Sequence, residues 1–401
     1  MRESFGALRE REFRLLFTGQ LISLLGDAFT SVALAFAVLS IGGATDLGIV
    51  FAAKSVPLVT FLLVGGVFAD RLPRRFVMLT ADVVRLGTQG GTAALVLTHN
   101  ARIWELALLQ ALAGTATAFF NPASTGLTPM TVSPERLQQA NALRGLSMSV
   151  AGLVGLGLGG TIVTLAGPGW ALAVDSASYV VSAWFLAQLR LPAHISLPAQ
   201  SFLSDLHDGW REFVARTWVW LIVMAASFGN LFTAIFGVLA AVVAKEHLGG
   251  AFAFTEILVG LSAGSLLGGF LSLRVHFRRP LYVGSALTAF LGVPTALLAV
   301  HAPALVVACG TFLAGTGNMV FNSLWETALQ RNVAPAALSR VSAYDWFGSL
   351  AFQPVGLAVA GPLAAGLGTS ATLWIASVGS VVIAGILVAT PSVRAVTSHP
   401  A

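Results

Sequence analysis

The sequence predicts an all-α integral membrane protein with twelve transmembrane helices, arranged as two pseudo-symmetric six-helix bundles with both termini in the cytoplasm. Three observations support this fold class. Of the 401 residues, 56% are hydrophobic and only 10% are charged, whereas a soluble domain carries about 25% charged residues. The chain also contains twelve long apolar runs, and its two halves resemble each other. These features exclude a disordered chain and a soluble globular fold.

The apolar runs are about 20 residues long or longer, which is the length that crosses a bilayer as a helix. Short clusters of arginine separate many of them. The expected spans are about 13–40, 47–69, 76–98, 103–125, 141–166, 170–190, 217–244, 252–275, 280–300, 303–330, 342–366 and 370–391.

The distribution of basic residues sets the orientation of these spans. With the N-terminus inside, 18 of the 22 lysines and arginines lie on the cytoplasmic side, and only Arg102 and Lys245 lie outside. Lys54 and Arg85 fall within spans. Cytoplasmic loops are enriched in Lys and Arg, so both termini are expected in the cytoplasm. The expected units are an N-terminal bundle at 1–190, a cytoplasmic linker at 191–216 and a C-terminal bundle at 217–401.

An internal repeat supports two equivalent bundles. A shift of 201 residues pairs Asn121 with Asn322, and a shift of 203 pairs Asp27 with Asn230. A shift of 204 pairs the arginines at 74 and 75 with those at 278 and 279. Parallel six-helix repeats of this kind place a substrate site near the bilayer midplane, at the repeat interface.

Polar residues recur at helical spacing on the first and fourth expected helix of each half. Such a stripe on an apolar span faces either a water-filled cavity or another helix. We interpret it as lining a substrate cavity, with hydrogen bonds between helices as the alternative. The candidates are Gln20, Ser23, Gln110, Thr117, Asn121, Asn230, Asn318 and Asn322, followed toward the cytoplasm by Trp325 and Glu326.

Asp27 lies near the centre of its expected span, where a charged side chain costs about 2.5–3.5 kcal/mol on insertion scales. Its repeat partner is the neutral Asn230. Because only the first half has an ionisable group at this position, the charge is expected to have a role. Asp27 is therefore the candidate for proton coupling or cation binding, and the alternative is a protonated carboxyl bonded to a neighbouring helix. Asp82 and Arg85 are expected to neutralise each other, and Asp175 is expected to cap its helix near the outer interface.

Two stretches resemble the major facilitator superfamily. Residues 66–75 read GVFADRLPRR, similar to the loop that joins the second and third helices in that family, with Pro73 where the family has Gly. The resemblance implies a gating loop that latches the two halves in the outward-facing state. Residues 152–160 read GLVGLGLGG and resemble the fifth-helix motif of the family's antiporters, with Leu156 in place of Pro. The gating-loop candidates are Gly66, Asp70, Arg71, Arg74 and Arg75, and those of the glycine motif are Gly155, Gly159 and Gly160.

Short phrases indicate a branch of this family. Residues 121–123 (NPA), 134–137 (PERL) and 330–333 (QRNV), with the glycine and aspartate at 26–27, are most similar to the macrolide-efflux and enterobactin-exporter branch. This resemblance implies proton-coupled export of small hydrophobic or amphipathic molecules, drug-like or siderophore-like, by alternating access. The expected partners are a small-molecule substrate, protons and the lipid bilayer, for a monomer in a bacterial inner membrane.

Other functions are less compatible with the sequence. A facilitator or importer in which Asp27 binds a cationic group is the main alternative, and a non-transporting sensor or scaffold is a remote one. The basic residues are dispersed, which does not favour nucleic acid. The chain has no H-E-x-x-H, C-x-x-C or Walker A sequence, and its seven histidines are scattered. No enzyme, metal or cofactor is therefore expected.

Overall fold

The computed structural model describes residues 6–191, 210–274, 277–333 and 335–396. Within those ranges it describes all side chains except those of residues 63–71, 138, 273 and 335–340. The chain divides into two compact units, 1–198 and 199–401. This boundary falls inside the expected linker, of which the described end, 210–214, is helical.

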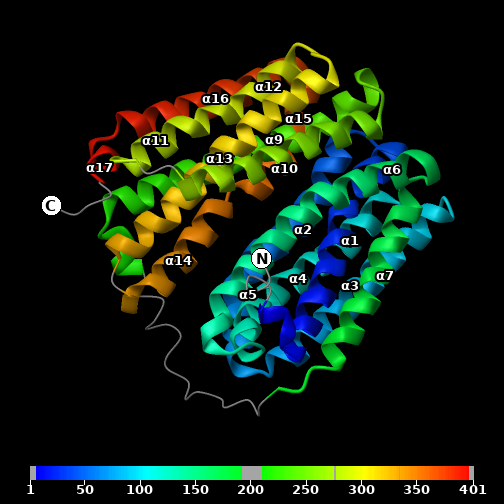
Figure 1. Ribbon diagram of the computed structural model, residues 1–401. Helices are drawn as coiled ribbons and strands as arrows, with labels where there is room; N and C mark the ends of the chain where they lie inside the picture. Colours follow the sequence, from blue (N-terminus) through cyan, green and yellow to red (C-terminus); the bar gives the residue numbers. More distant parts are fainter. Residues whose placement is uncertain (1–5, 192–209, 275–276, 334, 397–401) are drawn as a thin grey trace. The chain divides into compact units, whose positions relative to one another are not determined.

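The first unit consists of helices (Figure 1). In this unit α2 packs along α4, α3 packs against both α4 and α7, and α1 packs against α7 and α6. Short 3₁₀ turns lie at Gly6–Arg9, Thr128–Met130 and Pro134–Arg136. Its helices are α1 (Arg11–Ile41), α2 (Ala44–Arg71), α3 (Arg74–Leu97), α4 (Ile103–Leu127), α5 (Leu137–Val150), a π-helical turn at Ala151–Gly155, α6 (Leu156–Ala166) and α7 (Pro168–Ala187).

The second unit repeats the same packing with its own helices. Here α10 packs along α13, α11 and α12 pack against both α13 and α16, and α9 packs against α15 and α16. Its elements are α9 (Thr217–His247), α10 (Ala251–Arg274), α11 (Pro280–Leu287), a 3₁₀ turn at Thr288–Leu291, α12 (Gly292–Ala299), α13 (Ala304–Asn332), α14 (Pro335–Leu350), α15 (Gln353–Leu367), α16 (Thr369–Ala389) and α17 (Pro391–Arg394).

Within the described residues, eleven helical segments are long and apolar enough to cross a membrane. The remaining expected span is α3, which is 24 residues long and so also exceeds the length needed. Its hydropathy is lower because Asp82, Arg85 and Gln89 lie in its middle. All three side chains are buried, so the helix does not expose them to lipid. The all-helical membrane fold predicted from the sequence is confirmed.

Glycine contacts show the repeat at atomic detail. A β-carbon on Gly155 would lie 2.7 Å from Cβ of Ala28, and one on Gly356 would meet the backbone of Leu231. Gly155 and Gly356 are 201 residues apart, and Ala28 and Leu231 are 203 apart, which are the shifts that align the halves. Since only glycine allows such backbone approach, both halves join their first and fifth helices in the same way.

The sharp turns after the fifth helices also repeat. Gly167 has φ 93° and Gly368 has φ 87°, in the left-handed region that favours glycine. Each residue ends one helix and directly precedes the next, α7 or α16. The same turn therefore reverses the chain at equivalent positions of both halves.

Candidate functional site

Asp27 is held by a hydroxyl group from another helix. It lies near the middle of α1 and is half-buried. Tyr179 of α7 donates a hydrogen bond to Oδ1 of Asp27 over 2.5 Å. A charge-assisted bond of this kind is about twice as strong as a neutral one. The carboxyl is thus oriented by the protein while part of it stays accessible.

Asp175 lies one helical turn before Tyr179 on α7 and is completely buried. Thr30 of α1 donates to its Oδ2 over 2.6 Å, and Gln89 of α3 donates to the same oxygen over 2.7 Å. The other oxygen, Oδ1, is buried without a hydrogen-bond partner. The expectation that Asp175 caps a helix near the interface was wrong, because α1 and α3 enclose it.

Asp82 and Arg85 form the ion pair that their spacing predicts. Arg85 Nη1 lies 3.8 Å from Asp82 Oδ1, and both side chains are buried. Ser182 of α7 donates to Asp82 Oδ2 over 2.7 Å. The guanidinium carbon of Arg85 lies 4.3 Å from the ring centre of Phe120 and 5.7 Å from that of Tyr179. Aromatic faces attract a cation at such distances, so they stabilise this buried charge.

Gln110 links the fourth helix to these groups. It is fully buried, and its Nε2 donates to Oε1 of Gln89 over 3.0 Å. In this half it therefore joins α4 to α3, and its contact with substrate stays a prediction. The residues linked in this way are named here the N-half polar network: Asp27, Thr30, Asp82, Arg85, Gln89, Gln110, Asp175, Tyr179 and Ser182.

A second polar group lies two turns from Asp27 along α1. Gln20 is buried and donates to Ser124 Oγ over 2.6 Å. Arg144 of α5 donates to Ser124 Oγ over 3.2 Å and to Thr128 Oγ1 over 2.7 Å. Ser23, between the two groups, is also buried. These contacts join α1, α4 and α5 toward their cytoplasmic ends.

The remaining stripe residues of α4 and their counterparts differ in exposure. Thr117 is half-buried and donates to the carbonyl of Ala113 over 2.8 Å. Asn121 and its repeat partner Asn322 are both exposed, and Asn318 is half-buried. Exposed amides in the C-terminal halves of α4 and α13 are available to bind a polar group, so Asn121 and Asn322 stay candidates.

Asn230 does not repeat the environment of Asp27. It is half-buried in α9, and its Nδ2 donates to the carbonyl of Ser349 in α14 over 2.9 Å. The two residues occupy equivalent positions but bind differently. The carboxyl of Asp27 accepts a hydrogen bond from a hydroxyl group, whereas the amide of Asn230 donates one to a backbone carbonyl.

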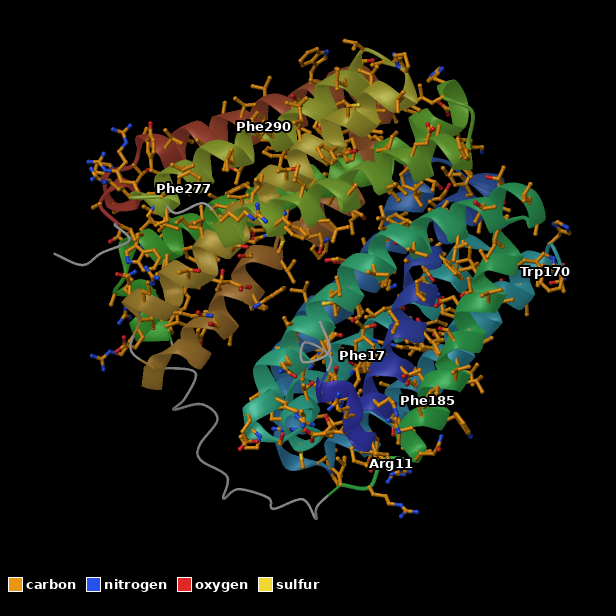
Figure 2. All side chains as sticks on the ribbon, viewed as in Figure 1. Arg11, Phe17, Trp170, Phe185, Phe277 and Phe290 are labelled. Carbon is orange, nitrogen blue, oxygen red and sulfur yellow. The ribbon has the colours of Figure 1, made fainter. Side chains whose placement is uncertain are left out.

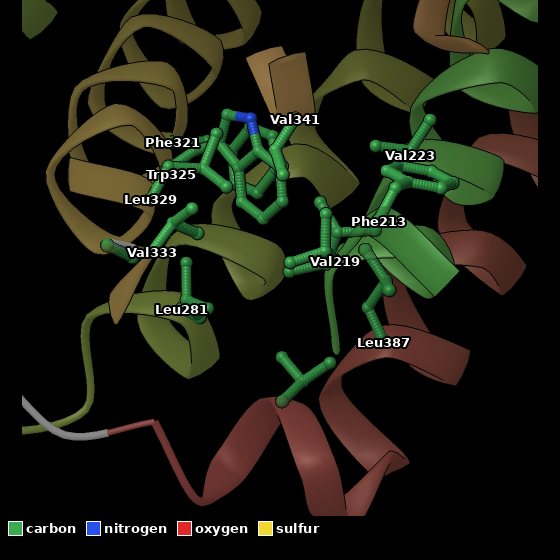
Figure 3. Packing of buried hydrophobic residues seen from close by; sticks show 13 residues of the cluster. Phe213, Val219, Val223, Leu281, Phe321, Trp325, Leu329, Val333, Val341 and Leu387 are labelled. Carbon is green, nitrogen blue, oxygen red and sulfur yellow. The ribbon is translucent and has the colours of Figure 1, made fainter. Parts of the chain in front are cut away.

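Trp325 is part of the largely apolar core of the second unit (Figure 3). It is buried beside Phe321, and its Nε1 donates to Asp345 Oδ2 of α14 over 2.9 Å. Its neighbour Glu326 is exposed. Sequence reasoning missed Asp345, although a shift of 201 pairs Asp345 with Arg144 and Trp325 with Ser124. In each half, the fourth helix therefore contacts the fifth helix at the same position of the repeat. The charged residue of this contact is Arg144 in the first half and Asp345 in the second.

The arginines of the expected gating loop bind helix ends. Arg74 donates to the carbonyl of Gly126 near the end of α4. Arg75 donates to the carbonyls of Ala187 and Leu189 (2.8 Å for Leu189) at the end of α7. Cations at carbonyl-rich helix ends are favoured by the helix dipole. The backbone of Gly66, Asp70 and Arg71 lies in α2, and their side chains lie outside the described residues.

The fifth-helix glycines lie against α1. The helix has a π-helical turn at Ala151–Gly155, directly within the glycine-rich stretch, and such turns are frequent at functional sites. A β-carbon on Gly159 would lie 2.8 Å from Cα of Phe29. Gly160 is buried as well. This contact begins two residues after Asp27, so the glycine motif packs beside the candidate carboxyl.

The acidic side chains in the interior of the described part of the chain have uncharged hydrogen-bond donors as partners. There, no three His, Cys, Asp or Glu side chains gather in a way that could hold a metal ion. The buried acids are instead bonded to Tyr, Thr, Gln, Ser and Trp donors. The polar interior groups are thus suited to holding protons or polar substrate atoms.

Comparisons with known proteins agree with this architecture. The family model of the Major Facilitator Superfamily matches residues 16–351. The multidrug efflux pump Tap of Mycolicibacterium fortuitum is 28% identical over 403 residues, which cover 95% of this chain and 96% of that protein. The enterobactin exporter EntS of Shigella boydii is 28% identical over 375 residues, or 88% of this chain and 85% of that one. The crystal structure of the nucleoside transporter NupG has a TM-score of 0.69 at 14% identity, covering 93% of this chain and 97% of NupG.

Proposed function

Because the chain belongs to the Major Facilitator Superfamily, it is a multi-pass membrane transporter of small molecules and not an enzyme, and we propose that it exports hydrophobic or amphipathic molecules in exchange for protons. It would act by alternating access, as a monomer in the cytoplasmic membrane of a bacterium. The similarity to a multidrug efflux pump and an enterobactin exporter over most of the chain supports export.

The observation that carries the proton-coupled mechanism is the environment of Asp27. The carboxyl lies half-buried near the middle of a 31-residue apolar helix and accepts a hydrogen bond from Tyr179. A carboxylate at this depth is costly unless it is paired or exchanges a proton. Protonation removes that cost, and ionisation is favoured when Tyr179 donates to the charged form. A carboxyl at this depth that can hold or release a proton is what a proton-coupled transporter requires.

Contact with the substrate would come from the polar stripes. Thr117, Asn121, Asn318 and Asn322 present hydroxyl and amide groups that are at least partly exposed. Few polar groups on an apolar background suit ligands that are mainly apolar. This arrangement favours amphipathic molecules over sugars or other fully polar solutes.

Everted membrane vesicles test the proposal. Respiration acidifies the lumen of such vesicles, so a proton-coupled exporter accumulates its substrate inside. The probes are ethidium, erythromycin and enterobactin, which represent a lipophilic cation, a macrolide and a siderophore. We expect accumulation of at least one probe above vesicles that lack the protein, with complete loss on adding a protonophore. Accumulation that persists without a proton gradient would contradict proton coupling.

A facilitator in which Asp27 binds a cationic group is the second candidate, because the half-buried carboxyl is accessible. The Asp27→Asn variant separates the two. A facilitator loses binding of ethidium to the purified protein whatever the gradient. A proton-coupled exporter retains that binding and loses gradient-driven accumulation.

A further inference from the structure

The N-half polar network contains more acidic than basic groups. Its carboxyls are Asp27, Asp82 and Asp175, and its one cation is Arg85. Lys54 of α2 is a further basic group, and it interacts electrostatically with Asp175. With the half-buried Lys54 included, two basic side chains face three carboxyls. With every group ionised, the network would carry one uncompensated negative charge.

Neighbouring helices supply no further cation to these acids. Among the described residues, the charged groups that interact with Asp175 are Asp27 from α1 and Lys54 from α2. Those that interact with Asp82 are Arg85 and Asp27. Residues 156–166 of α6 contain no charged residue. Arg144 belongs to the separate group around Gln20, about 10 Å along α1 from Asp27 at 1.5 Å per residue. A buried charge without a partner is costly enough that the group neutralises instead. A proton held within the network removes this cost, which acts most strongly on the completely buried carboxyls.

Geometry indicates which carboxyls hold it. Oδ1 of Asp82, like that of Asp175, has no hydrogen-bond partner, but Arg85 lies 3.8 Å from it and Ser182 donates to Oδ2, so a cation balances the Asp82 anion. Asp175 has two donors on Oδ2, whereas its Oδ1 is buried without a partner. An ionised Asp175 leaves that oxygen unsatisfied, and a proton on Oδ1 removes the charge. Asp27, by contrast, has Tyr179 as a donor and is partly exposed.

We infer that Asp27 and Asp175 share one exchangeable proton, so that Asp175 is a second proton-binding carboxyl of the transporter. The inference rests on the proposed proton-coupled function. In one state the proton is on Asp175 and Asp27 is ionised, and in the other Asp27 is protonated and Asp175 is the anion held by Thr30 and Gln89. Moving the proton between them breaks one O–H bond and forms another, with no other reactant. Two coupled carboxyls of this kind titrate as a pair.

Infrared spectroscopy of the purified protein in lipid, at pH 7 and with isotope-labelled aspartate, tests the shared proton. The protonated carboxyl gives a C=O band that an ionised one lacks. We expect Asp175→Asn to remove part of this band. Asp27→Asn should remove the same part completely. Either substitution leaves two carboxyls beside Arg85 and Lys54, so both carboxyls can be ionised and neither needs a proton. The control is Asp46→Asn, since Asp46 accepts a hydrogen bond from Gly43 at the start of α2, and it should leave the band unchanged.

Two results would overturn the inference. If Asp175→Asn removes no part of the band, Asp175 holds no proton. If Asp27→Asn leaves the Asp175 part in full, the proton is fixed on Asp175 and is not shared. Should Asp175→Asn fail to fold, Asp175→Glu replaces it, because this variant keeps the carboxyl and moves its C=O band out of the labelled-aspartate signal; an unchanged labelled band would then overturn the inference. The spectra need neither substrate nor gradient, so their outcome is independent of whether transport is proton-driven.

Discussion

Tyr179 shows how a single residue links the structure to the proposed chemistry. Its hydroxyl donates to Asp27, and its ring lies 5.7 Å from the guanidinium carbon of Arg85. It therefore contacts the carboxyl that is proposed to exchange protons and the cation that neutralises Asp82. The hydrogen bond joins α7 to α1, the helices that carry Phe185 and Phe17 in Figure 2.

The Tyr179→Phe variant should impair coupling while the protein still folds. It keeps the ring against Arg85 and removes only the donor to Asp27. A hydrogen bond to a charged group contributes about 1.5–3 kcal/mol, and a loss at the lower end reduces a rate about ten-fold. We expect gradient-driven accumulation to fall by about that factor in everted vesicles. Tyr282→Phe, on an exposed tyrosine of α11, is the matched control, and an equal fall in both variants would remove the special role of Tyr179.

The burial of Asp175 is the feature of the site that the sequence could not predict. Asp27 was identified because it is an isolated charge in a long apolar run. Asp175 lies only a few residues into its expected span, so a position at the interface was reasonable. Its burial depends on Thr30 and Gln89, which are 145 and 86 residues away in sequence. No local pattern carries that information.

At the scale of helices, close backbone contacts position the candidate site. The fifth helix approaches α1 through Gly155 and Gly159, next to Asp27. In the second unit, Gly260, Gly264 and Gly268 of α10 meet backbone carbonyls of α13 in the same manner. The sequence predicted most helix limits to within a few residues, but it began the eleventh span at 342, whereas α14 begins at Pro335. It did not predict the π-helical turn at Ala151–Gly155 or the 3₁₀ turn at Thr288–Leu291, because both lie within uninterrupted apolar runs.

Gly159→Ala tests the contact between α1 and α6. The new methyl would lie 2.8 Å from Cα of Phe29, which is backbone and cannot turn aside. Overpacking of this kind costs about 1–3 kcal/mol, so we expect a fall of a few degrees in the apparent Tm in detergent. The control is Gly157→Ala, whose methyl would meet nothing within 4 Å and which should be neutral or slightly stabilising. If both variants melt alike, the contact does not matter for stability.

At the scale of the whole molecule, the repeat accounts for most of what the sequence could predict. Two units, the turns at Gly167 and Gly368, and the paired glycine contacts all follow the shifts of 201–203 residues. The proposed function depends on positions at which the two halves differ. Asp27 faces Tyr179 whereas Asn230 binds a backbone carbonyl, and Arg144 is replaced by Asp345. The acidic groups around Asp27 are thus a property of the first half alone.

The most direct measurement of the central claim is transport by Asp27→Asn in proteoliposomes, using whichever probe the vesicles accumulate. Counterflow, in which labelled and unlabelled probe exchange, needs no net proton movement, whereas accumulation against a gradient does. We predict that the variant retains counterflow at a rate close to wild type and loses accumulation driven by a pH difference. Undiminished proton-driven accumulation in the variant would contradict the assignment of Asp27 as the coupling carboxyl.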